Sequence, residues 1–222
     1  MNCKSEIFNT SLNATEFIFR KHLCVPICYG IMEFTTDKII EILSAFSSVI
    51  SIWLNTKRKI LGWPIGLLSV LLAAWVYYKS SLFAECGLQV FFFISGIYGW
   101  WNWQTGKKED GKLRVDRISI SGLTTSLVCG ILGYALIYSV LIRFSEASLP
   151  LADAGITAFS IVAQIWLARR WIENWLLWIL INISSVLLYL NKELWFFSGL
   201  YGILLLLAIR GYMDWKKELH EK

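Results

Sequence analysis

Residues 63–103 read WPIGLLSVLLAAWVYYKSSLFAECGLQVFFFISGIYGWWNW, and their pattern recurs without a gap 112 residues later, at residues 175–215. Uncommon residues stay in register through the match: Trp63 with Trp175, Tyr77 with Tyr189, Gly87 with Gly199, Leu88 with Leu200, Gly99 with Gly211 and Trp103 with Trp215. With a slip of one residue the match extends upstream, since residues 45–47 and 52–54 resemble residues 158–160 and 165–167. The chain therefore contains two copies of one unit.

The composition is that of a polytopic membrane protein. Of the 222 residues, 56% are hydrophobic and 17% are charged, against about 25% charged in soluble proteins. Twelve tryptophans and nine tyrosines fit rings that are anchored at the lipid headgroups. The apolar runs are continuous and do not alternate with a period of two, so they predict membrane-spanning helices rather than a β-barrel.

Seven stretches are long enough, or nearly so, for helices of about 20 residues that cross a hydrocarbon core of about 30 Å. They are residues 39–54, 62–78, 86–103, 118–142, 149–168, 175–190 and 194–215. The stretch 118–142 has no counterpart in the duplication, and one extra helix lets two three-helix repeats point the same way across the membrane. The predicted fold is therefore an all-α membrane protein with seven transmembrane helices in a 3+1+3 arrangement of two parallel repeats. Parallel repeats are typical of transporters, whose substrate site lies near mid-membrane between the halves.

Basic residues gather in the loops on one side. Fourteen of the 21 lysines and arginines fall there, so the positive-inside rule places the C-terminus in the cytoplasm and the N-terminus outside. We divide the chain into an N-terminal extension that can hold an interfacial helix (1–38), a first repeat (39–104), a basic cytoplasmic loop (105–117), a linker helix (118–142), a second repeat (143–217) and a C-terminal tail (218–222).

Polar side chains within the spans are costly unless they pair or line an aqueous cavity. A stripe on the sixth span follows steps of three and four residues, so its members share one helix face: Trp175, Trp178, Asn182, Ser185 and Tyr189. One interpretation is that the polar members bond neighbouring helices and the rings pack. The other is a wall that stacks a flat ring and hydrogen-bonds a sugar or an amide.

Three further features are candidates for function. Gln89 lies one helical turn deeper in the third span than Glu85, an acid near the outer boundary that is either solvated or functional. The second span opens with Trp63, Pro64 and Gly66, which form either a plain helix start or a gate or hinge. The glycines at 87, 96, 99 and 199 are expected to allow close approach of helices.

Enzymatic motifs are absent from the sequence. It contains no phosphate-binding loop, zinc-site histidine pair or nucleophile elbow, so we predict no enzyme, no cofactor and no metal site. Five cysteines show no paired metal-ligand spacing. Membrane orientation explains the basic loops, so nucleic acid is not an expected partner.

The motifs in order give the chain a family resemblance. With WPIG at 63–66, LFAECGLQ at 82–89 and YGWWNW at 98–103, followed by NWxxW at 174–178 and GYxxW at 211–215, the chain resembles the PnuC family of bacterial vitamin transporters over about residues 39–217. One departure is Glu85 with Cys86, where the family often has an alanine-aspartate pair.

The resemblance implies uptake of nicotinamide riboside, a vitamin B3 precursor of NAD, across the bacterial inner membrane by facilitated diffusion. It further implies an enlarged SWEET-like fold, a homotrimer in the lipid bilayer, and a cytoplasmic kinase that traps the riboside by phosphorylation. The implied substrate contacts are Gln89, Trp175, Trp178, Asn182, Tyr98, Tyr189 and Trp53. A flat cationic ring suits an aromatic face, and a ribose and an amide suit polar side chains.

Two alternatives remain open. A sibling transporter for thiamine or a riboflavin-like vitamin would use the same scaffold, and a binding contest would separate these substrates. A non-transporting membrane scaffold or receptor would bind without flux, so liposomes that contain it would stay impermeable to the vitamin.

Overall fold

The computed structural model describes residues 36–79, 83–106, 108–109, 112–144, 149–191 and 193–220. These residues contain seven helices: Thr36–Thr56, α3 (Gly62–Lys79), α4 (Phe83–Thr105), α5 (Ile120–Phe144), α6 (Pro150–Ala168), α7 (Glu173–Asn191) and α8 (Trp195–His220). A short antiparallel hairpin pairs β1 (Lys108–Glu109) with β2 (Lys112–Leu113). The predicted all-helical class is confirmed, whereas the predicted interfacial helix in the N-terminal extension lies outside the described residues.

Five of these helices are long and apolar enough to cross a membrane, by length and composition: Thr36–Thr56, α5, α6, α7 and α8. The sequence also predicts spans at α3 and α4, which have 18 and 23 residues and so measure about 27 and 35 Å. Both are rich in tryptophan, tyrosine and glycine, whose hydropathy is near neutral. Their length fits a membrane crossing, although their mean hydropathy is lower.

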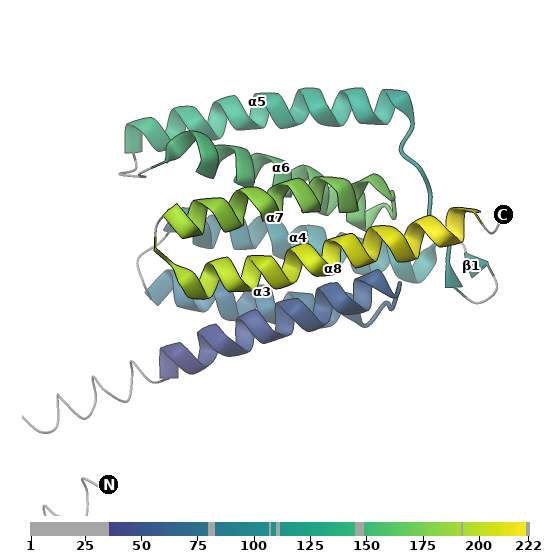
Figure 1. Ribbon diagram of the computed structural model, residues 1–222, viewed down its shortest axis with the longest axis horizontal. Helices are drawn as coiled ribbons and strands as arrows, with labels where there is room; N and C mark the ends of the chain where they lie inside the picture. Colours follow the sequence, from purple (N-terminus) through teal and green to yellow (C-terminus); the bar gives the residue numbers. More distant parts are fainter. Residues whose placement is uncertain are drawn as a thin grey trace, which may run out of the picture.

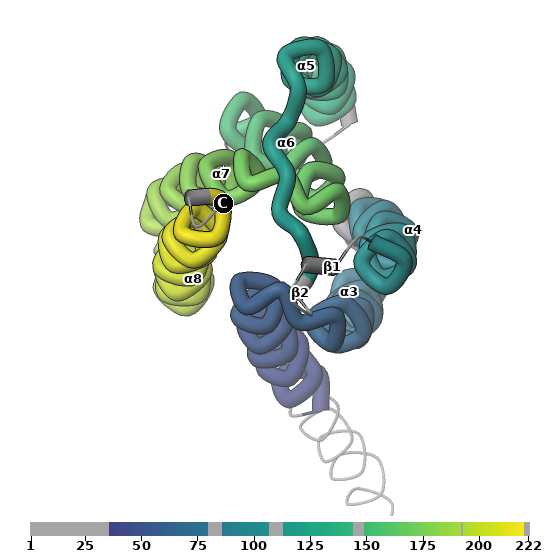
Figure 2. Tube along the Cα trace, turned by 90° about the vertical axis from the view of Figure 1, so that its right-hand side faces the viewer, coloured from purple at the N-terminus to yellow at the C-terminus, as the bar shows by residue number. Residues whose placement is uncertain are grey.

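The helices run alongside one another (Figure 1). Viewed along their axes, Thr36–Thr56, α3 and α4 lie on one side, and α6, α7 and α8 lie on the other (Figure 2). We call these the first and the second bundle. α5 lies at the periphery, where it packs on α6. The turns after Thr56 and Ala168, the segment between α4 and α5, and the C-terminal end of α8 all lie at one end of the bundles, which we call the basic end.

The duplication is visible in two tight turns at the basic end. Arg58 and Arg170 follow the first helix of each bundle, and both have a left-handed backbone, with φ of 55° and 62°. In each turn an amide reaches back five residues to a helix carbonyl, at 2.9 Å from Lys59 to Leu54 and 3.0 Å from Trp171 to Trp166. Such bonds satisfy the carbonyls that a helix end leaves open. The acceptors Leu54 and Trp166 are also 112 residues apart, so the one-residue slip expected at residues 52–54 is wrong at Leu54.

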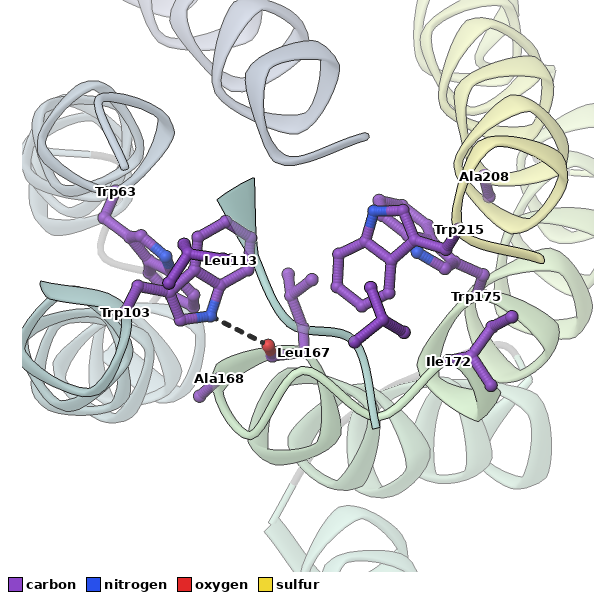
Figure 3. Packing of buried hydrophobic residues seen from close by; sticks show 10 residues of the cluster. Trp63, Trp103, Leu113, Leu167, Ala168, Ile172, Trp175, Ala208 and Trp215 are labelled. Carbon is purple, nitrogen blue, oxygen red and sulfur yellow. Dashed lines mark hydrogen bonds between the residues drawn. The ribbon is translucent and has the colours of Figure 1, made fainter. Parts of the chain in front are cut away.

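Aromatic packing repeats as well. Trp63 meets Trp103 edge to face at 5.4 Å between ring centroids, and Trp175 meets Trp215 edge to face at 5.4 Å. These rings form a buried cluster at the basic end (Figure 3), with the members Trp63, Trp103, Leu113, Val115, Leu167, Ala168, Ile172, Trp175, Ala208 and Trp215. The core thus joins both bundles at this end.

Glycines make room for two of these rings. A Cβ on Gly99 would overlap the ring of Trp63, and a Cβ on Gly211 would lie 2.6 Å from Cε2 of Trp175. A Cβ on Gly96 would lie 2.8 Å from Cδ2 of Leu67. The expected close approach is therefore confirmed at residues 96 and 99. It is wrong at residues 87 and 199, where a Cβ would have no atom of another helix within 4 Å in the described part of the structure.

We predict that Gly99→Ala and Gly211→Ala each destabilise the protein, because an added methyl group forces an indole ring out of its packed position, at a cost of about 1–3 kcal/mol. Thermal unfolding of the purified protein in detergent, followed by tryptophan fluorescence, measures the effect. Gly87→Ala and Gly199→Ala are matched controls from the same repeat register and should leave the unfolding temperature unchanged or raise it, because alanine favours a helix over glycine by about 1 kcal/mol. Equal shifts in all four variants would contradict the packing role.

Candidate functional site

The polar stripe of α7 lies inside the second bundle. Asn182 and Ser185 are 3% and 1% exposed, and one helical turn separates them, so their side chains share a face. Asn182 is the central residue of the 19-residue helix, about 13 Å from either end. The stripe therefore brings two polar groups to the middle of a span, as the sequence predicts.

These two groups are not satisfied by the surrounding chain. Within the described residues, Oδ1 of Asn182 and Oγ of Ser185 have no hydrogen-bond partner. A buried polar atom without a partner costs about 1–3 kcal/mol, so such atoms in a native protein call for an explanation. The other orphaned atoms lie near the basic end: Asn55 Oδ1, Trp63 Nε1, Trp166 Nε1, Arg170 Nε, Asn174 Oδ1 and Trp175 Nε1. Asn182 Oδ1 and Ser185 Oγ lie near the middle of α7, farther from the basic end than these six atoms.

In the first bundle, three buried serine hydroxyls donate hydrogen bonds to a neighbouring helix. Ser44 Oγ donates to the Ser69 carbonyl at 3.0 Å, and Ser69 Oγ donates to the Ser44 carbonyl at 2.8 Å. Ser51 Oγ donates to the Gly62 carbonyl at 2.7 Å. Here buried serines join neighbouring helices, which is the behaviour expected of interhelical bonding. Asn182 Oδ1 and Ser185 Oγ lack such bonds, so the interhelical interpretation of the α7 stripe does not account for them.

The aromatic members of the stripe lie at different depths. Trp175 is 1% exposed and packs within the core at the basic end. Trp178 is partly buried against that core. Tyr189 lies near the opposite end of α7, where it stacks on Tyr201 and on Phe197 at centroid distances of 5.2 and 5.5 Å. Of the rings, Trp178 lies nearest along the helix to the two unsatisfied polar groups.

The remaining candidates are more scattered. Gln89 is half-buried and lies six residues from the start of α4, as Ser185 lies six residues from the end of α7. Because these helix ends lie opposite the basic end, the two residues have similar depth. Tyr98 is exposed and lies closer to the basic end, while Trp53 is 50% exposed. Glu85 is in the first turn of α4, and its side chain lies outside the described part of the structure.

The WPIG segment is packed at the basic end. Trp63 is buried in the core cluster, and Pro64 lies in the first turn of α3, where its missing N–H costs little. A Cβ on Gly66 would lie 2.7 Å from Ser51 Oγ, so Gly66 allows close contact with the helix Thr36–Thr56. This contact supports a packing role, and a hinge at these residues remains a hypothesis.

Polar contacts join the bundles at the basic end through two interfaces. Between α4 and α6, Trp103 Nε1 donates to the Leu167 carbonyl at 3.3 Å, and Asn102 Nδ2 donates to the Ala168 carbonyl at 2.8 Å. Between α8 and the end of the first helix, Trp215 Nε1 donates to the Thr56 carbonyl at 3.1 Å. The tryptophans are repeat equivalents, so the two interfaces are related by the duplication.

Charged side chains reinforce both interfaces. Lys57 pairs with Asp214 at 2.7 Å, and Arg58 pairs with Glu218 at 2.6 Å. At the other interface Arg170 Nη1 donates to the Asn102 carbonyl at 2.6 Å. Partial burial lowers the pKa of the Arg170 guanidinium from its ordinary value, and the nearby Asp116 carboxylate opposes that shift. The basic end is thus closed by neutral and charged contacts together.

The sequence did not single out Leu113 and Val115. They are 3% and 2% exposed and belong to the same buried cluster as the core tryptophans of both bundles, and Figure 3 shows Leu113 beside Trp63 and Trp103. The signal that could have found them is the alternation of Leu113 and Val115 with polar Arg114 and Asp116, which is the pattern of a half-buried strand.

Among the residues that the structure describes, no group of three or more His, Cys, Asp or Glu side chains could hold a metal ion.

Comparison with known proteins assigns the chain to a family. The family model described as nicotinamide mononucleotide transporter matches residues 38–217. The chain belongs to this transporter family. Among its curated relatives, the nicotinamide riboside transporter PnuC of Escherichia coli (strain K12) is 30% identical over 209 residues, which cover 82% of this chain and 87% of the relative. The predicted resemblance to the PnuC family is therefore confirmed, and the family is one of transporters rather than enzymes.

Two further members of the comparison bear on fold and substrate. The riboflavin/roseoflavin transporter RibM of Streptomyces davaonensis is 28% identical over 172 residues, covering 75% of this chain and 79% of the relative. A crystal structure of the vitamin B3 transporter PnuC matches the fold with a TM-score of 0.67 and 23% identity, over 96% of this chain and 95% of the other. The family fold thus extends over nearly the whole chain.

We predict that Ser185→Ala leaves the thermal stability of this family member unchanged or raises it, because the substitution removes a buried hydroxyl that has no partner. Ser69→Ala is the matched control: it removes a bonded hydroxyl and should lower stability by about 0.5–1.5 kcal/mol. Unfolding in detergent without added ligand measures both. A loss at Ser185 as large as that at Ser69 would mean that Ser185 bonds a neighbouring helix.

Proposed function

We propose that this protein takes up nicotinamide riboside across the bacterial inner membrane by facilitated diffusion with alternating access. The observation that carries the proposal is the pair of unsatisfied polar atoms in the middle of α7, in a chain of this transporter family. The relatives named nicotinamide riboside transporter include the Escherichia coli PnuC and a protein from Neisseria mucosa that is 25% identical over 201 residues.

The chemistry of the riboside suits the α7 stripe. Asn182 Oδ1 and Ser185 Oγ can both accept hydrogen bonds, and the riboside offers donors in its carboxamide and its ribose hydroxyls. Its nicotinamide ring is flat and cationic, so an indole face such as that of Trp178 can attract it by stacking and by the cation–π interaction. We propose Trp178, Asn182 and Ser185 as the centre of the site, with Gln89, Tyr98, Tyr189, Trp175 and Trp53 as further candidate contacts.

Charge favours the riboside over the mononucleotide that the family description names. A phosphate monoester carries about −1.5 to −2 charges at neutral pH, and an unpaired charge within the membrane is costly. The sequences of α4, α6 and α7 contain no lysine or arginine, and in α3 the only basic residue is Lys79 at its end. A neutral stripe of this kind supports a substrate without a phosphate.

The direction of uptake follows from orientation and from trapping. We propose that the basic end faces the cytoplasm and that the N-terminus is periplasmic, because the basic loops gather there. Facilitated diffusion only equalises concentrations, so net uptake needs a sink inside. A cytoplasmic kinase that phosphorylates the riboside supplies one, since the anionic phosphate of the product does not fit a pathway without basic side chains.

We further propose the 3+1+3 arrangement of parallel repeats, with α5 as the linker helix. Its support is the repeated tryptophan pairs, the repeated turns at Arg58 and Arg170, and the peripheral position of α5. α5 exposes a long apolar face with Val128, Ile131, Leu132 and Leu136. Lipid and neighbouring subunits of a homotrimer are the proposed cover for that face, and native mass spectrometry measures the number of subunits.

A second candidate substrate is a riboflavin-like compound. The observation in its favour is the relative named riboflavin/roseoflavin transporter, which covers most of the chain. Thiamine is a third, because its cationic ring also suits an aromatic face, although it lacks the ribose that would engage Asn182 and Ser185.

Calorimetric titration of the purified full-length protein separates these candidates. We expect saturable binding of nicotinamide riboside, without comparable binding of thiamine, riboflavin, nicotinamide or nicotinamide mononucleotide. Preferred binding of riboflavin or thiamine would overturn the substrate while leaving the family in place. Preferred binding of the mononucleotide would overturn the charge argument.

We predict that Trp178→Ala weakens riboside binding at least about tenfold, because an aromatic contact at the centre of a site is worth about 2 kcal/mol or more. Trp178→Phe should be milder, since part of the stacking area remains. The same titration measures both variants.

Asn182→Leu is the control that distinguishes a ligand contact from a structural one. It removes an unsatisfied amide while keeping a similar volume, so the protein should fold with unchanged stability and bind the riboside weakly. If the two single variants Asn182→Leu and Trp178→Ala both bind the riboside with normal affinity, the stripe only packs.

A further inference from the structure

Residues 113–118 lead from β2 to α5 and run between the two bundles at the basic end (Figure 2). We call residues 113–118 the strap. Leu113 and Val115 point into the core, while Arg114 between them is exposed, as expected of an extended chain whose side chains alternate. Leu113 lies beside Trp63 and Trp103 of the first bundle, and the core tryptophans of the second bundle lie beyond it (Figure 3). The two buried side chains of the strap therefore belong to the core that joins the bundles at this end.

Backbone hydrogen bonds attach the strap to the second bundle. Asp116 forms a parallel bridge with Trp171: its amide donates to the Arg170 carbonyl at 3.1 Å, and its carbonyl accepts from the Ile172 amide at 3.0 Å. The Ile118 amide donates to Oε2 of Glu173 at 3.1 Å. These contacts fix the strap to the turn between α6 and α7.

Arg58 of the first bundle forms a hydrogen bond to the same strap. Arg58 Nη1 donates to the Leu113 carbonyl at 3.1 Å, and its Nη2 pairs with Glu218 of α8 at 2.6 Å. Arg58 thereby joins the end of the first helix both to the strap and to the second bundle. Its side chain is 12% exposed, so the pair is well shielded and its charge-assisted bonds are of the stronger kind.

We infer that the strap is the inner gate of the transport pathway, that it moves as one body with the second bundle, and that Arg58 is the contact whose release opens it. This inference rests on the proposed alternating access, in which the bundles must separate at the cytoplasmic end. Separation leaves the backbone bridge at Asp116 intact. It breaks the bonds of Arg58, the Lys57–Asp214 pair and the bond from Trp215 to Thr56. The hydrogen bonds between α4 and α6 at the same end break as well.

The first test measures access to the strap and needs no substrate. In a chain whose native cysteines are replaced by serine, Val115→Cys is labelled with a membrane-impermeant maleimide from the cytoplasmic side. The residues replaced are Cys3, Cys24, Cys28, Cys86 and Cys129. Adding Arg58→Gln should raise the labelling rate about tenfold, because the closed position of the strap then lacks the charge-assisted hydrogen bonds of Arg58.

Lys59→Gln is the matched control, because Lys59 is an exposed base one residue away, and it should leave the rate unchanged. Should Arg58→Gln fail to fold, Glu218→Gln removes one of the same bonds and should also raise the rate. Labelling that is no faster in the variant that folds would overturn the role of Arg58.

The second test joins pairs of cysteines in the same background and measures riboside uptake. Lys57→Cys with Asp214→Cys links the two bundles where an ion pair now meets, and uptake should fall more than tenfold and return on reduction. Asp116→Cys with Trp171→Cys links the strap to the second bundle. Paired strand residues lie about 4.8 Å apart, within reach of a disulfide, and this link should change uptake less than twofold.

Loss of uptake on linking residues 116 and 171 would mean that the strap leaves the second bundle, which overturns the inference. Unchanged uptake on linking residues 57 and 214 would mean that the bundles do not separate there, with the same consequence. Absence of riboside uptake by the unlinked parent would instead overturn the proposed function, and the labelling test would still decide the gate.

Discussion

Two indole N–H groups, each donated to a helix-end carbonyl of the opposite bundle, fix how the two halves of this protein sit together. Trp103 bonds the Leu167 carbonyl and Trp215 bonds the Thr56 carbonyl. An indole N–H is a donor only, and in a buried site its loss is costly. These bonds are shielded from water because Trp63 and Trp175 pack edge to face on the two rings. Gly99 and Gly211 leave the space that Trp63 and Trp175 occupy. Because Trp175 lies on α7, the same packing also holds the basic end of that helix against α8.

The two bundles share a backbone pattern but differ in their polar groups. At the positions equivalent to Asn182 and Ser185, the first copy has Val70 and Ala73. Its buried serines at 44 and 69 bond each other's backbone across two helices, so the first bundle needs no further partner there. In the second bundle, Asn182 Oδ1 and Ser185 Oγ have no hydrogen-bond partner among the described residues. At mid-depth, therefore, the second bundle has unsatisfied polar atoms and the equivalent positions of the first bundle are apolar, which suits a carrier in which one half supplies the main polar contacts to a small, asymmetric ligand.

Much of the fold could be predicted because its signals are local or repeated. The seven apolar stretches agree with the seven described helices to within a few residues, and the gap-free register predicts the equivalence of Trp63 with Trp175 and of Trp103 with Trp215. Helical periodicity also placed Asn182 and Ser185 on one face. Periodicity does not state which neighbour covers a face, however, so it could not show that Trp175 is buried against Trp215.

The parts that escaped prediction depend on contacts between distant segments. Gly87 and Gly199 occupy matching positions, yet their lack of close neighbours follows from where other helices run. The insertion of Leu113 and Val115 depends on a space between bundles that exists only after both have folded. A basic loop with two alternating apolar residues looks like an ordinary cytoplasmic connection until that space is known.

Uptake of labelled nicotinamide riboside into liposomes that contain the purified protein, without ATP or an ion gradient, tests the central claim most directly. We predict that the riboside enters until the internal concentration equals the external one, and that nicotinamide mononucleotide does not enter. Absence of flux above that of empty liposomes, or accumulation that needs an imposed gradient, would contradict facilitated diffusion of the riboside through this protein.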